Sequence, residues 1–141
     1  MFNRVAARFA HRLMAARAAD VVIRAPYLYR WHVAPKNRLL NVYLHRYHGS
    51  DPGPELHDHP WHSLSYVIEG ELREETPDGI VVRRAGDFVF RRAVQMHRVH
   101  LAGTRATTLF ITGPKFREWG FMTARGWVHW SDYLGKLPAR P

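Results

Sequence analysis

Beyond the Ala25–Pro26 step, the chain consists of short runs of aromatic and β-branched residues separated by Gly, Pro and Asp. Such runs are typical of β-strands, and the residues between them are typical of turns. The pattern predicts eight strands, at residues 28–32, 39–47, 63–68, 71–75, 80–84, 87–91, 97–101 and 107–112. Turns are expected at residues 49–54, 77–79, 85–86 and 102–103. Eight short, closely spaced strands favour a sandwich or a barrel, so the predicted fold class is all-β.

The length of the chain suits one domain. Of its 141 residues, 46% are hydrophobic, which is enough for a single ordinary core and too little for two. We expect residues 1–24 to form an N-terminal helix packed on the barrel. Residues 25–141 are expected to form the barrel itself, with an aromatic C-terminal segment.

The N-terminal helix is predicted from its periodicity. Apolar residues recur at helical intervals at Phe2, Val5, Phe9, Leu13 and Ala16. Such a stripe is typical of an amphipathic helix that lies on a domain. Residues 1–19 are also rich in Arg and free of acids, as organelle transit peptides are, and this remains the alternative.

The C-terminal segment is unusually aromatic. It contains Trp119, Phe121, Trp127, Trp130 and Tyr133 within a short stretch. Because so much aromatic surface is not expected to stay in water, we predict that this segment folds back over the barrel.

The net charge of +9 is concentrated near the N-terminus, where residues 1–46 hold nine Lys or Arg and a single acid, Asp20. A solvated basic face is the common origin of such an excess, although nucleic acid or an anionic membrane would also match it. No RNA- or DNA-binding signature is present, so a nucleic-acid partner is not expected. No apolar run is long enough to span a membrane, and no secretory signal is evident, so a cytoplasmic location is predicted.

Histidines are the candidate metal ligands. The chain has no cysteine, which leaves imidazoles and carboxylates. On an extended strand, His57 and His59 point to the same side. His97 alternates with Val99 and Leu101 in the pattern of a half-buried strand, so its ring is expected to point inward, whereas His100 lies on the opposite face. One buried His is commonly satisfied by a backbone carbonyl, but three that converge indicate a metal site.

These residues resemble the two sequence motifs of the cupin superfamily, over residues 51–101. In the first motif, His57, His59 and Gly70 are in register; in the second, Gly86 and His97 are. The resemblance implies a double-stranded β-helix, a jelly-roll-like barrel that holds a divalent metal ion. Several motif positions differ: Asp51, Arg92 and Val94 replace turn residues, Leu101 replaces Asn, and Ser63 replaces the metal-binding Glu.

The replacement by Ser63 leaves a site of three imidazoles. Neutral histidines do not offset the charge of a divalent ion, so its open positions should favour an anionic ligand. A three-His iron site is similar to that of the thiol dioxygenase branch of the cupins. Fe(II), Zn, Ni and Mn all suit imidazole ligands. The candidates for a fourth ligand are Ser63 itself and His62, the latter if Pro60 shifts the strand register.

The C-terminal segment with Arg117, Trp119 and Trp127 also resembles a group of small bacterial and phage cupins that have no assigned activity. Cupin membership is a statement about fold, because the superfamily includes enzymes, sugar-binding regulators and storage proteins. It also leads us to expect a homodimer, since many cupins pair through an N-terminal segment.

Three functions follow as hypotheses. The first is a metal-dependent enzyme such as a dioxygenase, in which Tyr66 or an arginine orients a small anionic substrate. Arg84, Arg91 and Arg92 are the candidate anchors. The second is a non-catalytic cupin that binds a sugar or another metabolite, with a structural metal or none. The third is an interaction protein that uses its basic N-terminal arm.

Overall fold

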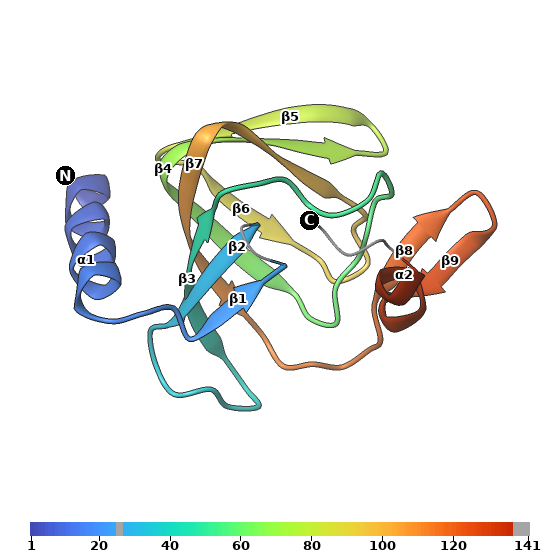
Figure 1. Cartoon of the computed structure of the whole chain (residues 1–141), viewed down its shortest axis with the longest axis horizontal. Coiled ribbons are helices and arrows are strands. Elements are labelled where there is room, and N and C mark those ends of the chain that lie inside the picture. The colour runs from blue at the N-terminus through green and yellow to red at the C-terminus, as the bar shows by residue number, and fades with distance from the viewer. Residues whose placement is uncertain (25–26, 137–141) are drawn as a thin grey trace.

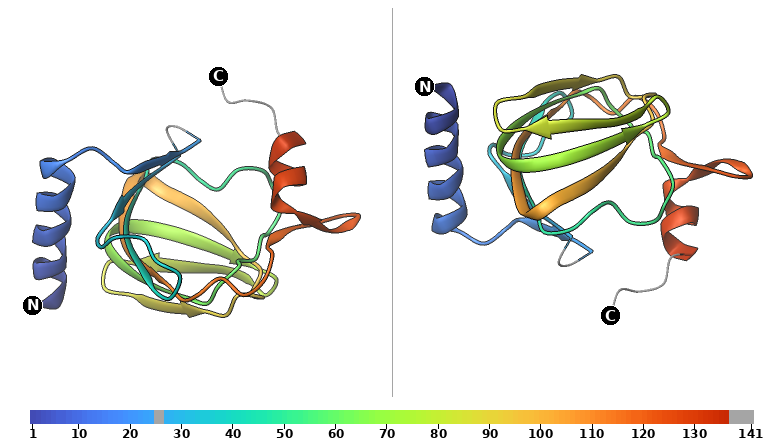
Figure 2. Two further views of the ribbon diagram at one scale, coloured as in Figure 1. Left: turned by 90° about the horizontal axis from the view of Figure 1, so that it is seen from below. Right: turned by 90° about the horizontal axis from the view of Figure 1, so that it is seen from above.

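The computed structural model describes residues 1–24 and 27–136. The expected break at Ala25–Pro26 and the last five residues of the expected C-terminal segment lie outside the described residues. Helix α1 (Phe2–Ala16) lies at one side of a strongly curved sheet, and a small hairpin with helix α2 (Trp130–Lys136) lies at the other (Figure 1). Views from below and from above, each at right angles to that of Figure 1, show the same three-part arrangement (Figure 2).

The main sheet has seven strands, and every strand pair in it is antiparallel. Their order is β1-β2-β3-β7-β4-β5, and β6 pairs with β4. The hairpin of β8 and β9 forms a second sheet. The all-β fold class with an N-terminal helix is therefore confirmed. The strand bounds are β1 Val21–Ile23, β2 Leu28–His32, β3 Asn41–Tyr47, β4 Ser63–Thr76, β5 Gly79–Arg84, β6 Phe88–Arg91, β7 Arg98–Thr112, β8 Gly120–Thr123 and β9 Gly126–His129.

Two expected breaks in the sheet are absent from the described strands. Residues 63–68 and 71–75 belong to the single strand β4, and β7 runs through the turn expected at residues 102–103. Gly70 accounts for the first difference, because its φ of 81° and the neighbouring register shifts bend β4 without ending it. A Cβ atom at Gly70 would lie 2.5 Å from the carbonyl oxygen of Arg105 on β7. Glycine here lets two long strands pair closely along a bend.

Helix α1 packs on the outer face of the sheet with small side chains. Ala6, Ala7, Ala10, Leu13 and Met14 contact a buried cluster that includes Trp31, Leu44, Tyr66 and Ile68. The expected contact stripe was wrong for most of its residues, because Phe2, Val5 and Phe9 are 60%, 62% and 46% exposed and Ala16 is exposed as well. Alanines allow the helix backbone to approach the sheet closely, and this turns the larger apolar residues toward solvent.

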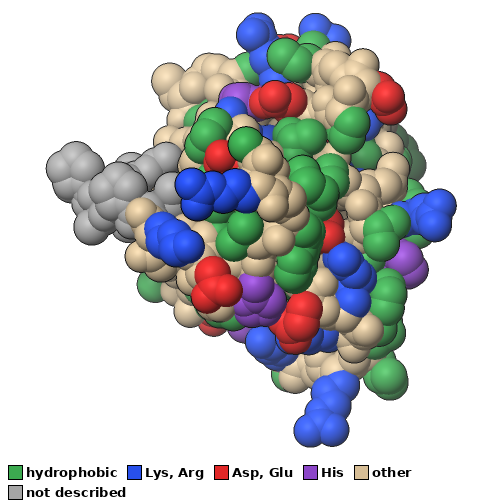
Figure 3. All heavy atoms as spheres, turned by 90° about the vertical axis from the view of Figure 1, so that its right-hand side faces the viewer, with side chains coloured by type: hydrophobic (Ala, Val, Ile, Leu, Met, Phe, Trp, Pro, Cys, Tyr) green, Lys and Arg blue, Asp and Glu red, His purple; other side chains and the backbone are tan. Residues whose placement is uncertain are grey.

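The aromatic segment folds onto the barrel in part. Phe121 and Tyr133 are buried, and their rings stack with centroids 3.9 Å apart. Trp127 and Trp130 remain 41% and 38% exposed, contrary to the expectation that these rings would all be covered. The face that carries β8, β9 and α2 shows a band of hydrophobic side chains with charged groups and histidines around it (Figure 3). Among the described residues, no helix has the length and apolar character that crossing a membrane requires.

Candidate metal centre

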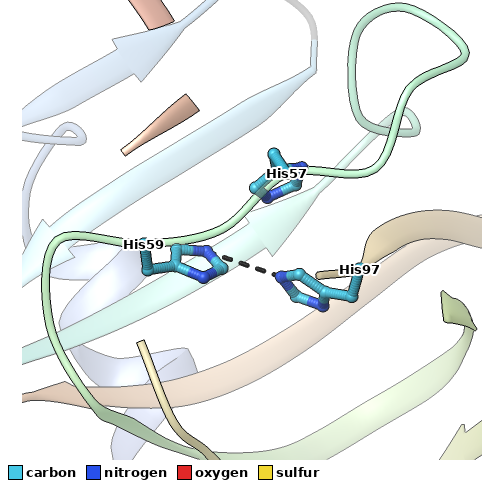
Figure 4. A group of neighbouring side chains, drawn as sticks. All are labelled: His57, His59 and His97. Carbon is cyan, nitrogen blue, oxygen red and sulfur yellow. Dashed lines mark hydrogen bonds between the residues drawn. The ribbon is translucent and has the colours of Figure 1, made fainter. Parts of the chain in front are cut away.

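Two extended segments bring three histidines together. The backbone N–H of His57 donates to the carbonyl of His97 at 2.8 Å, and the N–H of His97 donates back at 2.9 Å. The N–H of His59 donates to the carbonyl of Ala93 at 2.9 Å. Because His57 and His59 are two residues apart on an extended chain, both rings project toward His97 (Figure 4).

The imidazole nitrogens are close enough to share an ion. One ligand nitrogen from each ring lies within 4.8 Å of the others, and Nε2 of His59 and Nε2 of His97 are 3.5 Å apart. Metal–nitrogen bonds of about 2.1 Å hold donor atoms within about 4 Å of one another. The three nitrogens are therefore already near the spacing that a shared ion requires.

Burial favours the neutral form of His57 and His59. Burial lowers the pKa of His57 from 6.5 to about 4, although the nearby Asp51 carboxylate acts in the opposite direction. Burial also lowers the pKa of His59 well below its usual value, and the neighbouring His97 and His57 add to this effect. Nδ1 of His57 and Nδ1 of His59 are buried and have no hydrogen-bond partner in the described part of the chain. Neutral imidazole is the form that binds metal, so this donor set fits a divalent cation.

Glu74 orients the third histidine. Its Oε1 accepts a hydrogen bond from Nδ1 of His97 at 2.8 Å, and the Arg91 guanidinium donates to the same oxygen. Arg83 donates to Oε2 at 2.8 Å. Burial opposes ionisation of Glu74, but the hydrogen bonds from His97 and Arg91 outweigh it and lower the pKa of the carboxyl. The bond to Nδ1 leaves Nε2 of His97 free to face His59, as in metal-bound histidines with a supporting carboxylate.

Sequence reasoning missed Glu74. One signal was available in the strand expected over residues 71–75. Glu74 is two residues from Leu72 and so lies on the same face of that strand, and both side chains are buried. The partner of Glu74, His97, lies 23 residues further along the chain, just before β7, so the motif residues alone did not indicate the pair.

Two buried aspartates hold the surrounding chain. Asp58 points away from the two histidines beside it and accepts bonds from the Gly120 N–H at 2.7 Å and from Arg117 at 2.8 Å. It thereby attaches the C-terminal segment to the metal centre. Asp51, in the first glycine position of the motif, accepts a bond from the Val99 N–H at 2.6 Å and another from the Tyr27 hydroxyl. These bonds attach the segment that leads to His57 to β7 and to Tyr27.

The other expected site residues lie elsewhere. His62 is exposed, its Nδ1 accepts a bond from the Ala93 N–H at 2.9 Å, and its ring lies against Phe116. Tyr66 lies under α1 and donates to Oδ1 of Asn3 at 2.9 Å, so its hydroxyl is directed to the outer face of the sheet. Ser63 is buried on β4, and its Oγ has no partner among the described residues.

The three arginines expected to anchor an anionic substrate have different surroundings. Arg84 is exposed and lies 3.1 Å from Glu71, and Arg92 is exposed as well. Arg91 is buried against Glu74, so it supports the metal centre from behind. His100 is part-buried and bonds to Glu75 at 2.8 Å, outside the three-histidine group.

Comparison with known proteins shows the fold. No protein-family model and no curated sequence matches the chain. Among solved structures, a putative mannose-6-phosphate isomerase from Ralstonia eutropha is 23% identical with a TM-score of 0.57, covering 68% of this chain and 93% of that one. KdgF from Halomonas sp. is 18% identical with a TM-score of 0.59, covering 72% and 92%. An RmlC-like cupin from Shewanella frigidimarina is 24% identical with a TM-score of 0.52, covering 70% and 83%. The chain has the cupin fold.

This result confirms the barrel expected from the motif resemblance. In this chain, the segment that resembles the first motif supplies His57 and His59, and the segment that resembles the second supplies His97. The cupin fold and the three-histidine group together fit a metal-binding cupin.

Proposed function

We propose that this cupin is a metal-dependent enzyme that acts on a small anionic molecule through His57, His59 and His97, with a reaction of the oxygenase class. The observation that carries the proposal is the convergence of three imidazoles around one point. Because the ligand set is neutral, a divalent ion bound there keeps its full charge and attracts an anion to its open positions. Imidazole donors suit Fe(II), Zn, Ni and Mn, of which iron would serve an oxygenase.

The protein groups around the centre have distinct roles. A bound ion supplies Lewis-acid chemistry and, if it is redox-active, the means to use dioxygen. Glu74 holds the tautomer and orientation of His97. Trp61 stacks on His59 at 4.8 Å between centroids, and Phe121 lies 5.5 Å from His57. These rings keep bulk water from two sides of the centre, which strengthens electrostatic interactions within it.

Elemental analysis of protein purified without a His tag tests the metal. We expect about one equivalent of a divalent metal per chain in the native protein, and its loss in His97→Ala. His62→Ala is the matched control, because His62 lies outside the group, and it should retain the metal. A folded native protein that binds none of the four metals would contradict the proposal.

A non-catalytic binding module is the second candidate. The observation that favours it is Ser63, which stands where the motif has a metal-binding carboxylate. Oxygen consumption by the iron-loaded protein, measured against a panel of small anionic metabolites, separates the two functions. Ligand binding without oxygen uptake or any product would support the binding module.

We also propose that the chain forms a homodimer. Phe2 on α1 and Phe88 on β6 are each more than half exposed, and their rings lie 6.1 Å apart. Val5, Phe9 and Phe90 are exposed on the same two elements. Apolar patches of this kind commonly mark protein interfaces. Size-exclusion chromatography with light scattering tests the assembly, and a monomer at micromolar concentration would contradict it. A cytoplasmic location stays a prediction.

A further inference from the structure

A hollow of about 790 Å³ opens beside the metal centre. The loop between β2 and β3 and the segment between β7 and β8 line it, and both lie at the lower end of the barrel in Figure 1. Its lining contains five cations but only one acid, Glu118. The cations are Arg30, Lys36, Arg38, Lys115 and Arg117. A concave site of this size suits a small molecule.

Some of these cations already have an acidic partner. Lys115 bonds to Glu118 at 3.0 Å, and Arg117 pairs with Asp58. Lys36 and Arg38 have no acidic partner within the described ranges 1–24 and 27–136. The positive charge on this side of the hollow is therefore uncompensated.

Arg30 on β2 adds a third positive charge to the lining, and it has no acidic partner among the residues that the structure describes. Its Nε donates to Nε2 of His45 at 2.9 Å, and its guanidinium lies 4.6 Å from the centre of the Tyr43 ring. Burial lowers the pKa of His45 well below its usual value, so His45 is neutral and leaves the charge of Arg30 in place. The arrangement fixes the position of Arg30 without neutralising it.

The loop that presents Lys36 and Arg38 is held in one shape by two asparagines. Oδ1 of Asn37 accepts bonds from the N–H groups of Leu39 and Leu40 at 2.8 and 2.9 Å. Asn41 accepts a bond from the Asn37 N–H at 2.9 Å and donates to the Asn37 carbonyl at 2.8 Å. Because the loop is already ordered, binding does not have to order its backbone.

The hollow shares a wall with the metal centre. Trp61 lines the hollow and stacks on His59, and Nη1 of Arg117 donates to the His59 carbonyl at 2.9 Å. Tyr43 and Phe116 add further aromatic surface to the lining. An occupant can thus place a charged group near Lys36 and Arg38 and an apolar or planar part near Trp61.

We propose that this hollow binds the phosphoryl group of a small molecule, as in a phosphate monoester or a diphosphate. Three cations without acidic partners favour an anion of two or more charges, whereas a single carboxylate would neutralise only one of them. Arginine also forms paired hydrogen bonds with phosphate oxygens. A nucleic acid would require an extended basic surface, and the cations here gather in a concavity. That the hollow is part of a substrate site rests on the proposed function.

Isothermal titration with inorganic pyrophosphate at fixed ionic strength tests the proposal. The double variant Lys36→Gln/Arg38→Gln should bind pyrophosphate at least tenfold more weakly than the native chain. Arg8→Gln/Arg125→Gln removes the same charge from exposed positions outside the hollow, and it should bind within twofold of the native chain. Acetate should bind at least tenfold more weakly than pyrophosphate. Because the changed residues are exposed, all variants should retain the native circular dichroism spectrum.

A second arm separates the hollow from the metal. His57→Gln should keep native pyrophosphate affinity while it loses metal, so that a failed metal site would leave this result intact. Loss of pyrophosphate binding in His57→Gln would show that the anion binds at the metal and would overturn the proposal. No binding by the native chain, an equal loss in the control variant, or tighter binding of a single-stranded oligonucleotide would overturn it as well.

Discussion

The chemistry of the metal centre depends on a few buried polar contacts. His97 has an ionised carboxylate behind it, whereas Nδ1 of His57 lies 3.8 Å from Asp51, beyond hydrogen-bond distance. The three candidate ligands are therefore not equivalent. His97 is the one that the protein orients before any ion binds, because its ring is fixed by a charge-assisted hydrogen bond.

Replacement of Glu74 should weaken metal binding without removing a ligand. Glu74→Gln retains the size of the side chain but loses the charge that orients His97. We expect a 10- to 100-fold loss of Zn²⁺ affinity, measured by competition with a chromophoric chelator. Glu71→Gln is the control, since Glu71 pairs with exposed Arg84, and its affinity should stay within twofold of native. Equal affinity in Glu74→Gln and the native chain would show that His97 needs no support.

Among the elements, the paired strands β4 and β7 connect two parts of the molecule. One is the hydrophobic cluster under α1, and the other is the three-histidine group. Alternate residues of β4 face opposite sides, so Tyr66 and Ile68 pack under the helix. The same strand carries Glu74 to His97. The bend at Gly70 lies between the part of β4 that packs under α1 and the part that carries Glu74. On both sides of the bend, β4 stays paired with β7.

A side chain at Gly70 should destabilise the fold. Gly70→Ala combines a positive φ with a Cβ atom 2.5 Å from the Arg105 carbonyl oxygen, so we expect a loss of at least about 2 kcal/mol in the free energy of unfolding. Gly103→Ala is the matched control, since Gly103 also has a positive φ but open space around its Cβ position. Urea unfolding measures both. A loss at Gly70 no greater than at Gly103 would show that the close approach to β7 costs nothing.

The C-terminal hairpin should stabilise the segment that carries His57. Phe121 is buried between His57 and Tyr133, and Phe121→Ala should lower the free energy of unfolding by about 3 kcal/mol, since it leaves a cavity. Met122→Ala, at the exposed neighbouring position, should change it by less than about 1 kcal/mol. Similar values for the two variants would mean that the hairpin does not contribute to this core.

For the whole molecule, burial of neutral histidines links folding to pH. The pKa of His57 is about 4 in the folded chain and 6.5 in the unfolded chain. As the pH falls, the unfolded chain therefore takes up a proton at this residue before the folded chain does. Acidification within this window therefore favours the unfolded state, and the stability present above pH 6.5 is lost as the pH falls toward 4.

Urea unfolding of the metal-free protein at several pH values tests this linkage. We expect the free energy of unfolding to fall between pH 6.5 and 4, with about 3 kcal/mol due to His57. His57→Gln should show a shallower dependence in this window. His48→Gln, at an exposed position, should retain the native dependence. Equal slopes for His57→Gln and the native chain would rule out His57 as a source of the effect.

The local pattern of residues was sufficient to predict the all-β class and the pairing of His57 with His59. Strand alternation and turn residues act over a few neighbours, so the printed sequence contains them directly. The inward direction of His97 followed from the same alternation. These strand features depend on short-range geometry that a strand imposes wherever it lies. The barrel, by contrast, was implied by the resemblance to the cupin motifs.

Contacts between distant segments determined the rest. Glu74 reaches His97 only because β4 and β7 pair along a bend, and Tyr66 lies away from the centre because α1 covers that face of β4. The hollow likewise combines residues 36–41 with residues 112–118. Such pairs are brought together by packing of the complete chain, which selects one strand pairing and one helix face among several that local preferences allow.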